Sequence, residues 1–136
     1  MDRPVMLVTG PVLDAPDVGE LTRFYQRLLG WEVETFEQAP PGGPPGDGWS
    51  RLRPPDRSTK IEIQFEENYQ PPLWPQRLGD QGMQMHLDIW VDDVARGVAW
   101  AKECGALEAP SQPTGRDPAR LRVMLDPAGH PFCLWS

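Results

Sequence analysis

The chain has 136 residues, of which 39% are hydrophobic and 24% charged, a composition typical of one folded domain rather than of a disordered chain. Its 20 Asp and Glu residues outnumber its 13 Lys and Arg residues, and the formal net charge of −7 makes a phosphate backbone an unfavourable partner. No apolar run approaches the roughly 20 residues of a membrane helix, and the first ten residues lack a secretory signal's apolar core. We therefore expect a cytoplasmic protein that binds neither nucleic acid nor membranes.

The first half of the chain begins with a predicted strand and a predicted helix. Residues 5–13 are largely aliphatic and favour a strand. The helix is expected over residues 17–30, because Asp17 and Glu20 have the spacing of a capping box and Gly30 is a typical residue beyond a helix end. Its apolar residues recur at helical spacing, so one face is expected to pack on a sheet.

Three more strands are predicted after this helix. A loop over residues 40–48 is expected to interrupt them, because all of its residues except Asp47 are Pro or Gly. Apolar and polar residues alternate in the last of the three, which is the pattern of a half-buried strand. The three strands cover residues 31–38, 49–54 and 59–67.

The same order of elements is predicted again in the second half. A strand over residues 83–91 precedes a helix over 92–105, which Asp92 or Asp93 caps and Gly105 ends. Three strands follow, over residues 106–112, 120–126 and 131–136. The two cysteines, Cys104 and Cys133, are not at zinc-site spacing, and we expect both to be reduced.

This repeat predicts an α+β fold of two βαβββ modules in a single domain, residues 1–136. Module one covers residues 1–70, a connector covers 71–82 and module two covers 83–136. Each module has one helix, which covers one face of its sheet. The two open faces are therefore expected to form a curved mixed sheet around a central trough.

The strand over residues 83–91 has two chemically different faces. Leu87, Ile89 and Val91 are aliphatic and are expected to pack under the second helix, because alternate residues of a strand share a face. His86, Asp88 and Trp90 are then expected to face the trough. Asp88 could hold the imidazole of His86 in one tautomer for acid–base chemistry, or the two could form an ordinary structural pair.

Four segments of the chain resemble the vicinal oxygen chelate superfamily, in its glyoxalase-like and bleomycin-resistance-like branch. They are "LDAPDVGELTRFYQRLLGWEV", "GWSRLRPPD", "MQMHLDIWVDDVARGVAWAKECGA" and "VMLDPAGHPFCLW", in the order of the family. The resemblance implies the two-module fold and a homodimer. In members that use a metal, it implies four ligands in the trough, from the first and last strand of each module.

Carried over to this chain, the four ligand positions fall on Gly10, Gln64 (or Glu62 if the register slips by two), His86 and Cys133. Only His86 matches the residue type of the family. Glycine offers no donor, an amide is a weak ligand, and Cys133 stands where the family has Glu. We therefore expect no metal and no other cofactor.

Six residues are candidates for contact with a small-molecule ligand. His86 and Asp88 are the candidate catalytic residues, and each could instead have a purely structural role. Trp90 and Trp135 could stack on a flat ligand or simply pack, and Glu62 and Gln64 could face the trough or solvent. His130 is assigned to a tight turn. The ligand-binding candidates are Glu62, Gln64, His86, Trp90, Cys133 and Trp135.

Three functions remain open on this basis. The first is a small-molecule-binding protein that is independent of metal and could act as a lyase or isomerase on a small organic substrate. The second is a drug-sequestering resistance protein without catalysis, which the acidic composition favours for a cationic drug. The third is a metal-dependent lyase or dioxygenase of the same superfamily.

Overall fold

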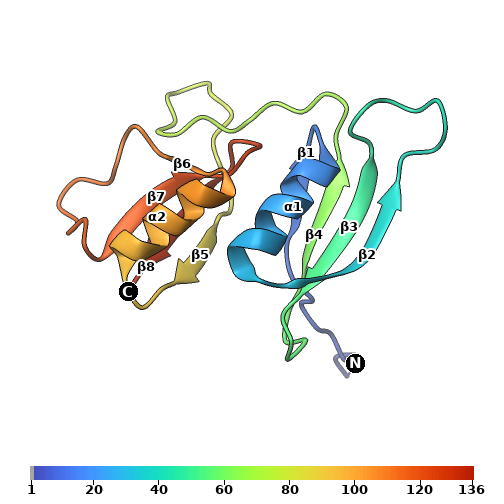
Figure 1. Ribbon diagram of the computed structural model, residues 1–136, viewed down its shortest axis with the longest axis horizontal. Helices are drawn as coiled ribbons and strands as arrows, with labels where there is room; N and C mark the ends of the chain where they lie inside the picture. Colours follow the sequence, from blue (N-terminus) through green and yellow to red (C-terminus); the bar gives the residue numbers. More distant parts are fainter. Residues whose placement is uncertain (1) are drawn as a thin grey trace.

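The computed structural model describes residues 2–136 and contains two four-stranded sheets with two helices (Figure 1). Module one consists of β1 (Val12–Ala15), α1 (Val18–Leu29), β2 (Glu32–Gln38), β3 (Gly48–Arg53) and β4 (Ile61–Phe65). Module two consists of β5 (Leu87–Trp90), α2 (Val94–Cys104), β6 (Leu107–Glu108), β7 (Leu121–Leu125) and β8 (Pro131–Trp135). The predicted α+β fold of two βαβββ modules is confirmed.

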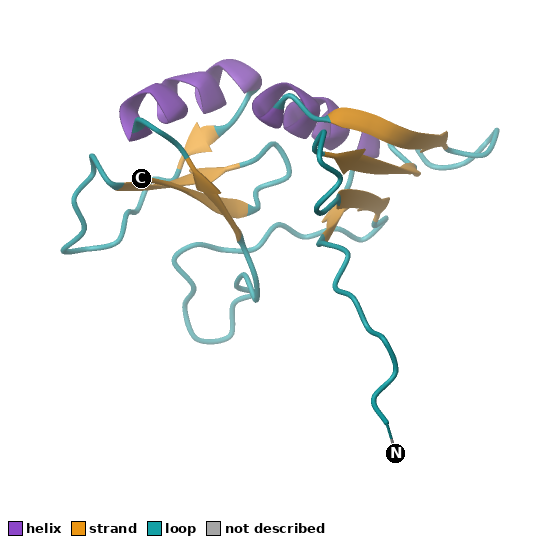
Figure 2. Ribbon diagram, turned by 90° about the horizontal axis from the view of Figure 1, so that it is seen from below, coloured by secondary structure: helices purple, strands orange, loops and turns teal. Residues whose placement is uncertain are grey.

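The two sheets have the same topology. Their strand orders are β1-β4-β3-β2 and β5-β8-β7-β6. In each sheet the first strand pairs parallel to the last one, and the other neighbours are antiparallel. Both helices lie on the same side of the molecule, which leaves the opposite faces of the sheets uncovered (Figure 2). Within residues 2–136, no helix is long and apolar enough to cross a membrane.

The helix ends follow the predicted capping chemistry. The Asp17 side chain accepts a hydrogen bond from the Glu20 backbone N–H at 2.9 Å, and that of Asp93 accepts one from Arg96 at 3.0 Å. Both satisfy amides that the first helical turn leaves unpaired. Gly30 and Gly105 end the helices in the left-handed conformation, which glycine adopts without strain.

Three predicted strands are much shorter than expected. The strand predicted over 83–91 is reduced to β5, so residues 83–86, including His86, lie outside it. Residues 5–11 are not a strand, because Pro11 lacks an amide hydrogen and no neighbouring strand pairs with the segment before it. Val5 and Val8 are consequently 92% and 99% exposed. The strand expected over 106–112 ends at Glu108, shortly before Pro110, and beyond it the Gln112 side chain bonds to the Val123 backbone instead.

The modules share one hydrophobic core and several polar contacts. Phe24 of α1 lies 6.1 Å from Phe132 of β8, between ring centroids. Tyr25 of the same helix donates a hydrogen bond to the buried carboxylate of Asp126 at 2.7 Å. Trp100 of α2 donates from its indole N–H to the Leu28 carbonyl of α1 at 3.1 Å. These contacts fix module two against α1.

The loop over residues 40–48 is exposed at its tip, but its end packs on the start of α1. The Val18 amide donates to the Gly46 carbonyl at 3.0 Å. A Cβ atom at Gly46 would lie 2.4 Å from the Pro16 carbonyl oxygen. Gly42, in contrast, has open space where its Cβ would be. The predicted loop is therefore free to vary at its tip and constrained at Gly46.

We predict that Gly46→Ala lowers the free energy of unfolding by about 1–3 kcal/mol, because it combines backbone strain with a steric clash. Gly42→Ala is the matched control, since its backbone also has a positive φ but its surroundings are open. It should cost about 1 kcal/mol. Chemical denaturation of the two variants measures the difference, and equal losses would contradict the packing of Gly46.

Candidate functional site

A cleft of about 700 Å³ lies between residues of the two modules and the connector. Asp14 and Tyr25 line it from module one, Tyr69 and Gln70 from the segment after β4, and His130 from module two. The remaining wall is mostly apolar and includes Val12, Leu13, Met83, Met85 and Leu87, and His86 also lies in it. A cleft of this size with few polar groups is typical of a site for a small organic molecule.

The fixed charge in the cleft wall is negative. Among the described residues that line it, none is Lys or Arg, and Asp14 is the one carboxylate. The positive side chains that module one carries nearby are already paired: Lys60 and Arg51 contact Glu62 at 2.9 and 3.0 Å. The cleft is therefore better suited to a cation or a neutral molecule than to an anion.

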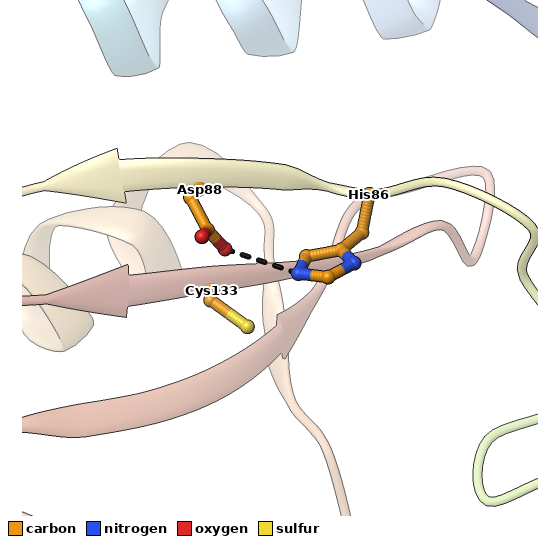
Figure 3. Close-up of side chains that lie close together, drawn as sticks. All are labelled: His86, Asp88 and Cys133. Atoms are coloured by element: carbon orange, nitrogen blue, oxygen red, sulfur yellow. Dashed lines mark ion pairs between the residues drawn. The ribbon is translucent and has the colours of Figure 1, made fainter.

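His86, Asp88 and Cys133 lie together on the open face of module two (Figure 3). Nε2 of His86 is 3.0 Å from Oδ1 of Asp88, and one donor atom from each residue lies within 4.8 Å of the others. Burial, together with the charge of Asp88 and a hydrogen bond to it, raises the pKa of Cys133 to about 11. The thiol is therefore protonated near neutral pH, which makes it a poor nucleophile.

The predicted faces are confirmed within β5: Leu87 and Ile89, like the following Val91, pack against the core, whereas Asp88 and Trp90 are exposed. His86 precedes the strand and lines the cleft, as Leu87 does, but Asp88 and Cys133 are not among the residues that line it. Trp90 pairs in register with Trp135 on β8, but their side chains are 61% and 42% exposed. Neither lines the cleft. Contact of these two indoles with a ligand stays a prediction.

On module one, Gln64 and Glu62 lie on the open face of β4 but are engaged differently. Gln64 pairs in register with Asp14 and donates a hydrogen bond from Nε2 to Oδ1 of Asp14 at 2.6 Å. Glu62 is partly buried, which favours its neutral form, but hydrogen bonds from Lys60 and Arg51 outweigh this and lower its pKa. Its carboxylate is thus occupied by side chains of the protein.

A second polar cluster joins the cleft to the core. Asp126 is buried, and its Oδ2 contacts the Tyr25 hydroxyl and Nδ1 of His130, both at 2.7 Å. Nε2 of His130 is 3.3 Å from the Tyr69 hydroxyl. His130 lies in the turn that the sequence predicts, whereas the contact of Tyr25 with this turn was not predicted. The signal available was the Asp and His of "DPAGH", four residues apart.

The four positions that the family resemblance assigns to metal ligands do not form a four-ligand centre. A Cβ atom at Gly10 would lie 2.1 Å from the Lys60 carbonyl oxygen, so no ligand side chain fits there. Gln64 donates from its amide nitrogen to Asp14 and offers a metal only its neutral amide oxygen, which is a weak ligand. His86 and Cys133 remain, with Asp88 as a third donor, and all three belong to module two. The donors present do not fit the expected centre.

Comparison with known proteins agrees with the fold. A family model described as a glyoxalase-like domain matches residues 11–135. The comparison with curated proteins finds no match.

Three solved structures illustrate the similarity. A glyoxalase family protein from Enterococcus faecalis has 22% identity and a TM-score of 0.66, with 96% of this chain and 97% of that one covered. A fosfomycin resistance protein from Listeria monocytogenes, complexed with Mn(II) and 1S,2S-dihydroxypropylphosphonic acid, has 15% identity and a TM-score of 0.68, with 97% and 93% covered. An antibiotic-binding protein from a Streptomyces species has 18% identity and a TM-score of 0.59, with 98% of each covered.

We predict that the purified protein holds no stoichiometric divalent metal. The physical reason is that no ligand side chain fits at Gly10 and that Gln64 offers only a neutral amide oxygen. Elemental analysis of protein prepared without a metal-affinity tag checks this. About one Zn, Ni, Fe or Mn per chain, removed by a chelator with loss of ligand binding, would contradict it.

Proposed function

Because the chain belongs to the glyoxalase-like domain family, we propose that it binds a neutral or cationic organic molecule in the cleft between its modules, without a metal ion. The observation that carries this proposal is the composition of the wall. Apolar side chains dominate it, Asp14 supplies a negative charge, and the described lining residues include no cation. An organic body gains by burial there, whereas an anionic group loses its hydration without a counter-charge.

The similar structures support this choice in two ways. The phosphonic acid complex of the Listeria protein involves a Mn(II) ion, and the donors of the present chain do not fit such a centre. The Streptomyces protein has the same fold and is described as binding an antibiotic. A drug-sequestering role is therefore the form of the proposal that the cleft supports best.

A metal-independent lyase or isomerase is the second candidate. One observation favours it: His86 lines the cleft while its Nε2 lies 3.0 Å from Oδ1 of Asp88. A carboxylate beside an imidazole can fix the tautomer and the orientation of the ring, as general acid–base catalysis on a bound substrate needs. A cytoplasmic location agrees with either candidate, because Cys104 and Cys133 are both free thiols.

The ligand class can be tested with three probes that share a shape and differ in charge: 2-phenylethylamine, 2-phenylethanol and phenylacetate. We predict that the amine and the alcohol bind, that phenylacetate binds weakest, and that added Zn²⁺ or Mn²⁺ changes none of these affinities. Isothermal titration, with methyl NMR shifts of Met83 and Met85 to locate the probe, measures this. His86→Ala should weaken binding while leaving the circular dichroism spectrum unchanged.

Two results would overturn this proposal. One is phenylacetate binding as tightly as the amine. The other is binding of any probe that appears only after metal is added.

We also propose that the protein forms a homodimer. Val5, Met6, Leu7 and Val8 form an aliphatic run that is 76–99% exposed, and its backbone has no strand partner within the described chain. A second copy can cover such a run and pair with its backbone. We predict a dimer by light scattering at micromolar concentration, and Leu7→Asp should shift it toward monomer. A monomer at high micromolar concentration would contradict this.

A further inference from the structure

Three side chains from separate segments line the same cleft: Asp14 from β1, Tyr69 from the segment after β4, and His130 from the turn before β8. The rings of Tyr69 and His130 are 5.7 Å apart between centroids and meet edge to face. The Glu66 N–H donates to the Ala15 carbonyl at 3.0 Å and the Tyr69 N–H donates to the Glu66 carbonyl at 3.2 Å, so the turn that carries Tyr69 adjoins the end of β1 that carries Asp14. Burial, followed by the negative charges of Asp126 and Asp14, raises the pKa of Tyr69.

The hydrogen bonds of His130 leave one ring nitrogen available. Nδ1 is 2.7 Å from a carboxylate oxygen of Asp126, so this nitrogen carries a proton. Nε2 faces the Tyr69 hydroxyl at 3.3 Å, but that hydroxyl donates its own proton to the Ala128 carbonyl at 2.7 Å. In the neutral ring, Nε2 is therefore an acceptor without a committed donor.

Asp14 is also only partly satisfied. Its Oδ1 accepts the hydrogen bond from Gln64, and its Oδ2 has no hydrogen-bond partner among residues 2–136. No Lys, Arg or His of the described chain forms an ion pair with it. Gln64 thus acts as a positioning residue, which holds the carboxylate at the cleft wall and leaves one oxygen for a ligand.

We propose that Asp14, Tyr69 and His130 form a subsite for a protonated amine of the ligand. Asp14 supplies the opposite charge, Nε2 of His130 accepts one N–H, and the Tyr69 hydroxyl oxygen accepts another. This subsite rests on the proposed function, since it names the group by which an organic ligand is held. One carboxylate with one imidazole and one phenol offers fewer oxygen ligands than a hard metal cation requires, and an ammonium with three donors suits the arrangement.

The test compares 2-phenylethylamine with 2-phenylethanol by isothermal titration on four proteins: wild type, Asp14→Asn, His130→Gln and the control Asp92→Asn. Asp92 is an exposed carboxylate outside the cleft, so its substitution makes the same change in net charge. In wild type the amine should bind roughly tenfold more tightly than the alcohol. Asp14→Asn and His130→Gln should lose most of that preference and keep the alcohol affinity within about twofold, whereas Asp92→Asn should behave like wild type.

The outcomes separate the two proposals. Equal affinity of wild type for the amine and the alcohol, or an amine affinity that Asp14→Asn leaves unchanged, overturns the subsite and leaves the cleft as a binding site. Failure of wild type to bind either probe overturns the proposed function. Long-range ¹⁵N NMR of the unliganded protein is an independent check, because a neutral His130 protonated at Nε2 instead of Nδ1 would remove the acceptor.

Discussion

The buried carboxylate of Asp126 is the interaction on which the geometry of the site depends. It accepts hydrogen bonds from the Tyr25 hydroxyl of module one, from Nδ1 of His130, and from the backbone amides of Ala128 and His130. A buried charge is tolerated only when its lone pairs are used, and here four donors use them. One residue thereby ties helix α1 to the turn before β8 and orients the imidazole in the cleft wall. The cleft forms between two modules that this contact holds in one relative position.

The open faces of the two modules have diverged in their chemistry. Module two keeps His86 beside Asp88 and Cys133, whereas module one uses its polar residues on one another. Glu62 neutralises Lys60 and Arg51, and Gln64 supports Asp14. The described residues that line the cleft include no Lys or Arg, and Asp14 is their one carboxylate. The proposed preference for neutral or cationic ligands depends on this pairing of Lys60 and Arg51 with Glu62.

Much of the fold could be predicted from the sequence because its signals are local. Capping by Asp17 and Asp93, helix ends at Gly30 and Gly105, and alternation in the strands each depend on a few neighbouring residues. The alternation of residues 87–90 also indicated the two faces of β5 correctly. It could not reveal the cluster of Tyr25, Tyr69, Asp126 and His130, because most of these residues are far apart in the chain and meet only when the modules pack. The prediction of a strand over residues 5–13 was wrong for a related reason. Aliphatic residues favour a strand, but a strand forms only where a neighbouring strand pairs with it, and β1 begins at Val12.

Gly10 has a consequence for how the chain could change. The backbone itself excludes a side chain at this position, since φ is +139° and the Lys60 carbonyl occupies the space of a Cβ atom. A single Gly10→His substitution would therefore strain the start of β1 and displace the neighbouring β4 segment before it could supply an imidazole. A ligand side chain at this position would need coordinated changes in the backbone segments that lead into β1 and β4. Gly10 thus makes these two segments depend on each other, so that neither can take a larger side chain by a single substitution.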